Sequence, residues 1–203
     1  MIHVPFGLKL RNFAYPLLIM IIYLVGFMGS GKTYTGKLLA GELGLPHVDL
    51  DQWIEEKYDK SISAIFESEG EEGFREKETL ALSELNRLFA IENEDNTSER
   101  SVRLIVSTGG GAPCFNGNMD WMNHHGLTIW LNPPVETLLK RLEKEKDHRP
   151  LLSGLSKEDM RRFIECKLDE RTSFYGKALL KLDQENIDIK TLINSIKHAQ
   201  NIQ

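Results

Sequence analysis

The segment Gly26–Thr33 carries the clearest chemical pattern of this chain. Its sequence, Gly-Phe-Met-Gly-Ser-Gly-Lys-Thr, fits the phosphate-loop pattern G-x-x-x-x-G-K-[ST]. The apolar run 17–25 before it predicts a buried strand, and the residues from Lys32 onward predict a helix. A glycine-rich turn that binds nothing is the alternative, but the strand–loop–helix order favours nucleotide binding. Lys32 would then reach the β- and γ-phosphates, the Thr33 hydroxyl would bind Mg²⁺, and the helix N-terminus would add positive charge.

Two carboxylates, Asp49 and Asp51, follow a second short apolar run at 46–50. Residues two apart on a strand face the same side, so we expect both carboxylates to project together from the carboxyl end of this strand. Open α/β sheets bind ligands at that edge. One carboxylate near Mg²⁺ and one near an acceptor hydroxyl is what phosphoryl transfer requires. The alternative is that either Asp caps the helix that follows.

Three consecutive glycines, Gly109, Gly110 and Gly111, end a predicted strand at 102–107. They leave backbone N–H groups accessible and let a ligand approach without a Cβ in the way, although a plain flexible turn has the same composition. Three arginines stay unassigned by spacing alone. Arg75 lies among acidic helix neighbours, Arg149 lies in a charged segment beside Pro150, and Arg171 lies near the end of a predicted helix, where a cation satisfies the helix dipole.

Strand and helix patterns alternate along the chain, which predicts an α/β fold with a mostly parallel sheet covered on both faces. The predicted strands are 17–25, 46–50, 102–107, 127–131 and 178–182. The predicted helices are 32–43, two short ones within 53–69, and 71–91, 135–145, 157–171 and 189–198. The polar segment 92–101 is predicted to be a solvated loop, and His124 and His125 to lie in a polar turn.

Composition indicates one globular domain: the chain has 203 residues, of which 41% are hydrophobic and 27% charged. The net charge of −5 argues against general attraction to nucleic acid. Cys114 and Cys166 lack metal-ligand spacing and are typical of a reducing cytoplasm. We expect a cytoplasmic monomer.

Residues 1–19 are expected to be an N-terminal extension that is not part of the native protein, with Met20 as the natural start. The apolar stretch after Lys9 and Arg11 superficially resembles a signal peptide, but it continues into the first predicted strand. It is also shorter than the roughly 18–20 residues that a spanning helix needs, so no membrane association is expected.

Taken together, these motifs resemble those of shikimate kinases. The resemblance rests on Gly26…Thr33, Asp49-x-Asp51, Gly-Phe-Arg75-x-x-Glu78, Gly109-Gly-Gly111, Arg149-Pro-Leu-Leu and Arg171-x-x-x-Tyr175, in this order from about Met20 to Leu182. It implies the P-loop fold of nucleoside-monophosphate kinases: a three-layer α/β/α sandwich with a five-stranded parallel sheet and a lid. It implies one domain over 20–203, with a substrate-binding helical region at about 49–92 and a lid at about 146–156.

The resemblance also implies the reaction and the residues that serve it. The γ-phosphoryl group of ATP would pass to the 3-hydroxyl of shikimate, in the biosynthesis of chorismate and the aromatic amino acids. Asp51 would orient the 3-hydroxyl or accept its proton, and Thr33 and Asp49 (through a water) would hold Mg²⁺. The residues implied to bind ATP are Gly29, Ser30, Gly31, Lys32, Thr33, Tyr34 and Arg149. Those implied to bind shikimate are Asp51, Arg75, Gly109, Gly110, Gly111 and Arg171. Lys32 and Arg149 would also stabilise the transferring phosphoryl group.

The chain departs from the family pattern in the loop after the last predicted strand. Family members often carry a basic residue near the adenine there, whereas residues 183–187 contain no arginine. Arg141 is the remaining candidate for stacking on the adenine. Two alternatives stay open at this point: another small-molecule kinase of the same fold, such as a gluconate kinase, and a non-catalytic ATP-binding module.

Overall fold

A computed structural model of the chain describes residues 21–90, 102–145 and 152–201. The predicted N-terminal extension with its start at Met20, the predicted loop at 92–101 and most of the predicted lid, including Arg149, lie outside the described residues. None of the helices within the described ranges is long and apolar enough to cross a membrane.

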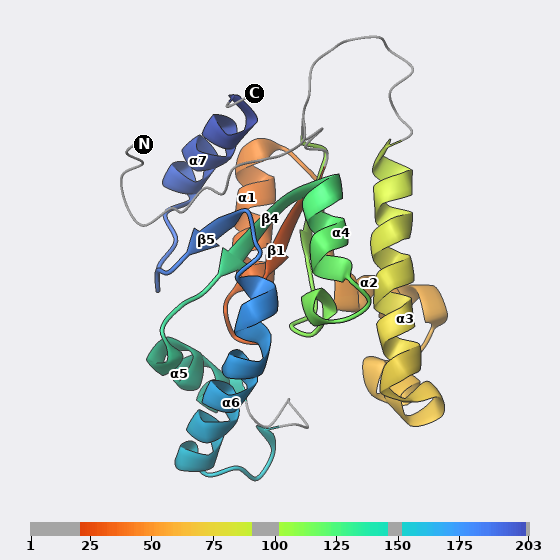
Figure 1. Cartoon of the computed structure of the whole chain (residues 1–203), viewed down its shortest axis with the longest axis vertical. Helices are drawn as coiled ribbons and strands as arrows, with labels where there is room; N and C mark the ends of the chain where they lie inside the picture. The colour runs from red at the N-terminus through yellow and green to blue at the C-terminus, as the bar shows by residue number, and fades with distance from the viewer. Residues whose placement is uncertain (1–20, 91–101, 146–151, 202–203) are drawn as a thin grey trace.

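A single five-stranded parallel sheet forms the centre of the molecule, as the alternating pattern predicted (Figure 1). Its strands lie in the order β2-β3-β1-β4-β5. Their bounds are Ile21–Val25 (β1), His47–Asp49 (β2), Leu104–Ser107 (β3), Gly126–Leu131 (β4) and Leu180–Leu182 (β5). The central strand β1 is buried along its whole length, because a parallel strand covered by helices on both faces has no solvent side.

Helices connect the strands and cover the sheet on both faces. Their bounds are Lys32–Leu43 (α1), Leu50–Tyr58 (α2), Ile62–Ala90 (α3), Asn118–His125 (α4), Val135–Glu145 (α5), Lys157–Tyr175 (α6) and Ile189–Asn201 (α7), with a short 3-10 helix, η1, at Ala112–Cys114. Gly31 and Gly44 flank α1 in the left-handed conformation, so a glycine both opens and closes this helix. The long α3 is kinked at Gly70, whose φ of 72° is not helical.

Two hydrophobic clusters lie on opposite faces of the sheet. On one face, α1 and α7 contribute Leu39, Leu192 and Ile196 against β1, β4 and β5. On the other face, α2, α3 and α4 contribute residues such as Ile54, Leu82 and Met122. The result is the three-layer α/β/α sandwich that the sequence predicted.

A third hydrophobic cluster joins the loop after β1 to α5 and α6. Phe27, which is 1% exposed, packs among Leu138, Leu142, Met160 and Ile164. These two helices flank the predicted lid in sequence. The phosphate loop is therefore packed directly against the helices that lead into and out of the lid segment.

The structure corrects several predicted boundaries. The predicted strand 46–50 ends at Asp49, because Leu50 begins α2 and Asp49 caps it. His124 and His125 lie in the last turn of the helix α4, where their Nδ1 atoms contact the carbonyl oxygens of Asp120 and Trp121, and not in a turn. The predicted helix 157–171 continues to Tyr175, so Arg171 lies a full turn inside it.

Candidate active site

The phosphate loop wraps a concave turn between β1 and α1. Gly29 and Gly31 have φ values of 76° and 95°, which side chains with a Cβ rarely adopt. The Lys32 side chain folds across the turn, and its Nζ donates hydrogen bonds to the carbonyl oxygens of Gly26 at 2.8 Å and Phe27 at 2.9 Å. The ammonium group therefore already lies over the loop.

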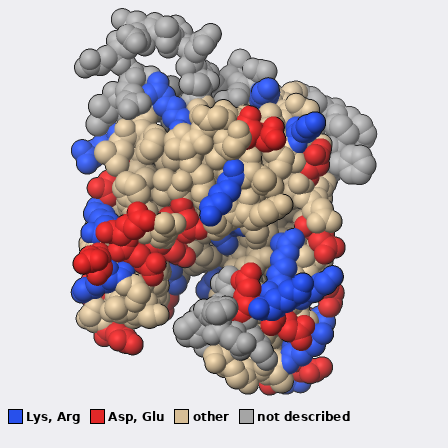
Figure 2. Space-filling model, turned by 180° about the vertical axis from the view of Figure 1, so that it is seen from behind, with Lys and Arg blue, Asp and Glu red and all other residues tan. Residues whose placement is uncertain are grey.

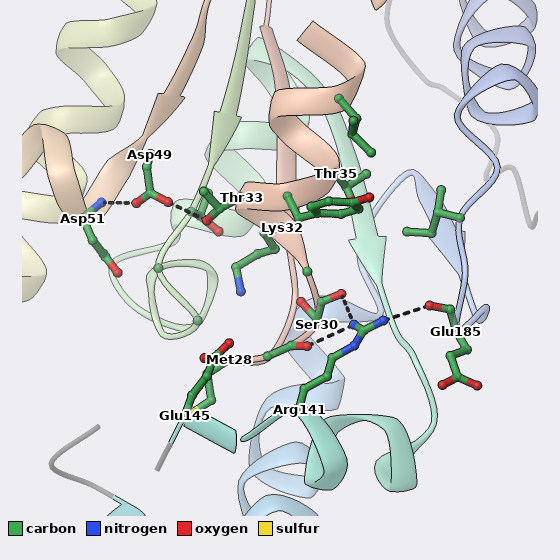
Figure 3. A pocket seen from close by; sticks show the side chains of 18 of the residues that line it. Met28, Ser30, Lys32, Thr33, Thr35, Asp49, Asp51, Arg141, Glu145 and Glu185 are labelled. Carbon is green, nitrogen blue, oxygen red and sulfur yellow. Dashed lines mark hydrogen bonds between the residues drawn. The ribbon is translucent and has the colours of Figure 1, made fainter. Parts of the chain in front are cut away.

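A pocket of about 760 Å³ opens in front of this loop. It is lined by the loop itself, by Asp49 and Asp51, by Thr108, Gly109 and Gly110, and at its other end by Arg141, Glu145 and residues 185–187 (Figure 3). From behind, a deep hollow separates the side of the molecule formed by α2 and α3, where acidic side chains gather, from the side formed by α5 and α6 (Figure 2). The pocket thus combines loops from the carboxyl edge of the sheet, where the sequence placed the site.

Asp49 connects the phosphate loop to the start of α2. Its Oδ2 accepts a hydrogen bond from the Thr33 hydroxyl at 2.6 Å, and its Oδ1 accepts one from the backbone N–H of Asp51 at 3.2 Å. The capping alternative is therefore correct for Asp49, which holds the loop hydroxyl at the same time. The prediction that both carboxylates sit on one strand is wrong, because Asp51 is in the first turn of α2. Both still face the same pocket (Figure 3).

Asp51 presents a carboxyl group in an unusual environment. Its Oδ1 is buried and accepts no hydrogen bond from the described residues. Burial, and next the negative charge of Asp49, raise the pKa of Asp51 to about 6, while Lys32 and Arg75 oppose part of that rise. A carboxyl group with a pKa close to the working pH suits proton acceptance.

Arg75 and Glu78 form an ion pair within α3. The sequence patterns had assigned no role to Glu78. Arg75 Nη1 donates to Glu78 Oε2 at 2.7 Å, and Nη2 donates to Glu71 Oε1 at 2.9 Å. Glu78 is completely buried, and its other oxygen, Oε1, has no partner among the described residues. The Arg-x-x-Glu spacing could have predicted this ion pair, since side chains three residues apart on a helix are neighbours.

The buried Glu78 predicts a pH-dependent stability. Burial raises the pKa of Glu78 to about 7, although Arg75 opposes the rise. Because the folded state then keeps a proton that the unfolded state releases near pH 4.5, this group's contribution to stability falls as the pH rises from about 4.5 and levels off above about 7. In Glu78→Gln this dependence is absent. Urea unfolding at pH 5.5 and pH 8 should therefore show the wild type losing stability relative to the variant as the pH rises.

Glu136→Gln is the matched control for this prediction. Glu136 is exposed, and its contact with Arg161 lowers its pKa, so it is ionised in both states over this range. The difference in unfolding free energy between wild type and Glu136→Gln should stay constant between pH 5.5 and pH 8. A constant difference for Glu78→Gln as well would contradict the assignment.

Two of the three glycines after β3 are required by close approach to functional side chains. A Cβ at position 109 would stand 2.7 Å from both Asp51 Oδ1 and Glu78 Oε1. A Cβ at position 111 would stand 2.5 Å from Arg75 Nη1. The turn therefore allows the two carboxyl groups and the arginine to reach the same small space.

Arg171 approaches the same turn from α6. Its guanidinium lies 5.8 Å from the centre of the Phe27 ring, and a Cβ at Gly110 would stand 3.5 Å from its Nη1. Burial raises the pKa of the nearby Cys114 thiol to about 11, and the positive charges of Arg171 and Arg75 both oppose that rise. Tertiary folding thus brings the two arginines, 96 positions apart in sequence, next to adjacent glycines of the same turn.

Arg141 lies at the opposite end of the pocket. It donates from Nη1 to the carbonyl oxygens of Gly29 at 3.1 Å and Ser30 at 3.2 Å, and from Nη2 to that of Glu185 at 2.9 Å (Figure 3). These bonds occupy the edges of the guanidinium and tie the phosphate loop to the loop after β5. Tyr34, 72% exposed, lines the same pocket.

The parallel sheet, the phosphate loop and the acidic pair beside it define a P-loop kinase of the nucleoside-monophosphate-kinase type. Comparison with known proteins specifies the family: the profile of the shikimate kinase family matches residues 28–199. The chain belongs to the shikimate kinase family.

The matches to similar proteins cover nearly the whole length of those proteins. A shikimate kinase of Parabacteroides distasonis is 44% identical over 88% of this chain and 95% of its own. One of Phocaeicola vulgatus is 40% identical over 89% and 98%. The crystal structure of the Bacteroides thetaiotaomicron shikimate kinase matches with a TM-score of 0.74 at 35% identity, covering 90% of this chain and 97% of that one. That of the Acinetobacter baumannii enzyme, in complex with shikimate, matches with a TM-score of 0.71 at 32% identity, covering 91% and 96%.

Proposed function

We propose that this protein transfers the γ-phosphoryl group of ATP to the 3-hydroxyl of shikimate, giving shikimate 3-phosphate and ADP. Family membership supports the kinase activity and the substrate pair. The observation that carries the proposal is the pocket, which the phosphate loop and Asp51 line together. Asp51 Oδ1 has no hydrogen-bond partner among the described residues, and Arg75 and Arg171 lie next to the glycine turn at the pocket edge. A gluconate kinase is not favoured, since the named relatives are shikimate kinases.

The donor set fits Mg²⁺ beside the phosphates. The Thr33 hydroxyl and the Asp49 carboxylate are oxygen ligands held 2.6 Å apart, and Mg²⁺ prefers oxygen ligands with several waters retained. We infer that Thr33 binds the ion directly and Asp49 through a water. When bound, the ion neutralises charge on the phosphates.

In this arrangement each remaining residue has one task. Asp51 accepts the proton of the 3-hydroxyl, and Lys32 stabilises charge that develops on the transferring group. Gly109, Gly110 and Gly111 contact shikimate, through N–H groups at positions 110 and 111. Gly29, Ser30, Gly31 and Tyr34 bind ATP. Arg149 stays a predicted lid residue that binds ATP and stabilises charge on the transferring phosphoryl group, while the lid excludes water.

Arg75 and Arg171 are proposed to bind the carboxylate of shikimate, which their guanidinium geometry suits. Arg171→Ala should weaken shikimate binding by about 1.5–3 kcal/mol, the value of a hydrogen bond to a charged group, with the KM for ATP nearly unchanged. Arg75→Ala should do the same and also lower thermal stability, since it leaves Glu78 buried without its ion pair. Titration calorimetry with shikimate measures the loss of shikimate affinity in each variant.

Arg162→Ala is the matched control, because Arg162 is an exposed arginine on the same helix as Arg171. Its shikimate affinity should equal that of the wild type. Unchanged shikimate affinity in both Arg75→Ala and Arg171→Ala would sink the carboxylate assignment.

An assay of ADP release with Mg²⁺ and ATP tests the function directly. Shikimate, gluconate, AMP and a blank without acceptor are compared, and the product is identified by mass. Release that depends on shikimate and yields shikimate 3-phosphate is expected. Release with gluconate or AMP alone would reject the substrate and keep the fold.

We also propose a cytoplasmic monomer that binds no nucleic acid. The net charge of −5 and the acidic surface over α2 and α3 support the last point (Figure 2). Free thiols at Cys114 and Cys166 are typical of a reducing compartment. A single species near 23.2 kDa in solution is the expected result of a mass measurement.

A further inference from the structure

Tyr175 ends α6, and its buried hydroxyl reaches the glycine turn of the pocket. The residue is completely buried, and its ring packs 5.7 Å from that of Trp130 on β4. Its Oη donates a hydrogen bond to the carbonyl oxygen of Gly110 at 2.5 Å. Burial raises the pKa of this hydroxyl, against the opposing charge of Arg171, so it keeps its proton at neutral pH and remains a donor.

Each carbonyl group of the glycine turn has its own donor. Gly109 O accepts from Ala112 N at 3.3 Å, and Gly111 O accepts from Cys114 N at 2.8 Å, both within η1 and its approach. Only the middle carbonyl, that of Gly110, is held by a residue distant in sequence, 65 positions away. The orientation of that one peptide therefore depends on where α6 ends.

The hydrogen bond from Tyr175 to the Gly110 carbonyl also fixes the direction of the Gly111 N–H. The Gly110 carbonyl and the Gly111 N–H belong to one trans peptide, so they point in opposite directions. A carbonyl held by Tyr175 directs the Gly111 N–H away from Tyr175. Within the described ranges, neither Gly110 N nor Gly111 N donates a backbone hydrogen bond. Both remain available to a ligand.

The Gly110–Gly111 peptide lies between the phosphate loop and the end of α6. A Cβ at position 110 would stand 3.4 Å from the backbone N of Met28 and 3.5 Å from Arg171 Nη1. Arg171 precedes Tyr175 by four residues, so both side chains leave the same face of α6. The end of this helix thus presents a cation and a hydroxyl to the same turn.

We propose that Tyr175 is a positioning residue that sets the Gly110–Gly111 peptide, so that the Gly111 N–H meets shikimate beside Arg75 and Arg171. This inference rests on the proposed role of the glycine N–H groups in binding shikimate. It assigns a function to the Tyr of the Arg-x-x-x-Tyr motif, which the reaction itself leaves unused.

Tyr175→Phe tests the proposal because it removes only the hydroxyl. The KM for shikimate should rise about ten-fold, the loss typical of one buried hydrogen bond, while the KM for ATP changes less than two-fold. Tyr23→Phe is the matched control: Tyr23 is equally buried, and its hydroxyl has no partner among the described residues. That variant should keep both KM values. An equal rise in the KM values for ATP and for shikimate in Tyr175→Phe would overturn the proposal.

Glycine-selective ¹⁵N NMR separates the inference from the binding role it rests on. In the wild type, the amide signal of Gly111, among the 16 glycines, should shift when shikimate is added. No shift in the wild type would refute the role of the glycine N–H groups. A shift of the same size in Tyr175→Phe would leave that role intact and reject the positioning by Tyr175.

A fluorinated protein keeps the test decisive if the Phe variant does not fold. With 3-fluorotyrosine at all five tyrosines, the ¹⁹F signal of Tyr175 should move on addition of shikimate and that of Tyr23 should not. A Tyr175 signal that stays in place at saturating shikimate would overturn the proposal.

Discussion

Lys32→Met is expected to lower kcat by at least about 10²–10³-fold at saturating ATP, the usual effect of removing one preorganised charge from a transition state. The physical reason is the position of Nζ over the loop, held by the carbonyl oxygens of Gly26 and Phe27. In the proposed role, the same ammonium meets the phosphates of bound ATP, whose charge spreads over more oxygens as the group transfers. Methionine is also unbranched, one atom shorter than lysine, and carries no charge.

Separate assays of nucleotide binding and turnover make this prediction specific. ATP binding is measured by calorimetry and should persist with reduced affinity, whereas transfer to shikimate is lost. Lys37→Met is the matched control, because Lys37 is an exposed lysine on the same helix. Turnover near that of the wild type in Lys32→Met would contradict the assignment of the phosphate loop.

Asp51→Asn is expected to lower turnover by about 10²–10⁴-fold, the range that a positioned general base contributes. The substitution keeps the shape of the side chain, so ATP binding should stay nearly intact. Asp59→Asn is the matched control at the other end of α2. Asp59 is exposed with φ of 49°, a conformation that asparagine accepts readily. Normal turnover in Asp51→Asn would refute the catalytic role.

The pH profile adds a second signature of Asp51. Only the carboxylate form can accept a proton, and its pKa is raised to about 6. In the wild type, kcat/KM for shikimate should therefore rise with pH through about 6. The residual activity of Asp51→Asn should lack this limb. A limb of equal size in the variant would assign the titration to another group.

Local sequence patterns predicted the central elements well, because their causes are local. The apolar residues of β1, the glycines around Lys32 and the alternation of strands and helices each follow from short-range chemistry and period. The helix α4 was missed, since its sequence Asn-Met-Asp-Trp-Met-Asn-His-His has few strong helix formers. Its formation depends on Met119 and Met122 packing against the sheet.

Asp49 and Asp51 face the same pocket, as predicted, but not for the reason that strand alternation gave. Alternation along a strand predicted that Asp49 and Asp51 face one side. The chain instead turns into a helix at Leu50, capped by Asp49. Both side chains reach the pocket because the first turn of α2 folds back toward the phosphate loop, and that path depends on tertiary contacts.

The phosphate loop, the class of fold and the residues that carry the family resemblance could all be predicted from the amino-acid sequence. These follow from motifs whose spacing is a few residues, within which covalent geometry limits the arrangement. Three features come from the packing of distant segments: Arg75 and Arg171 approach one glycine turn, Glu78 Oε1 is buried without a partner among the described residues, and Tyr175 holds Gly110. Such contacts join segments up to about a hundred residues apart, and they arise when helices pack on the sheet, an event that no short pattern records.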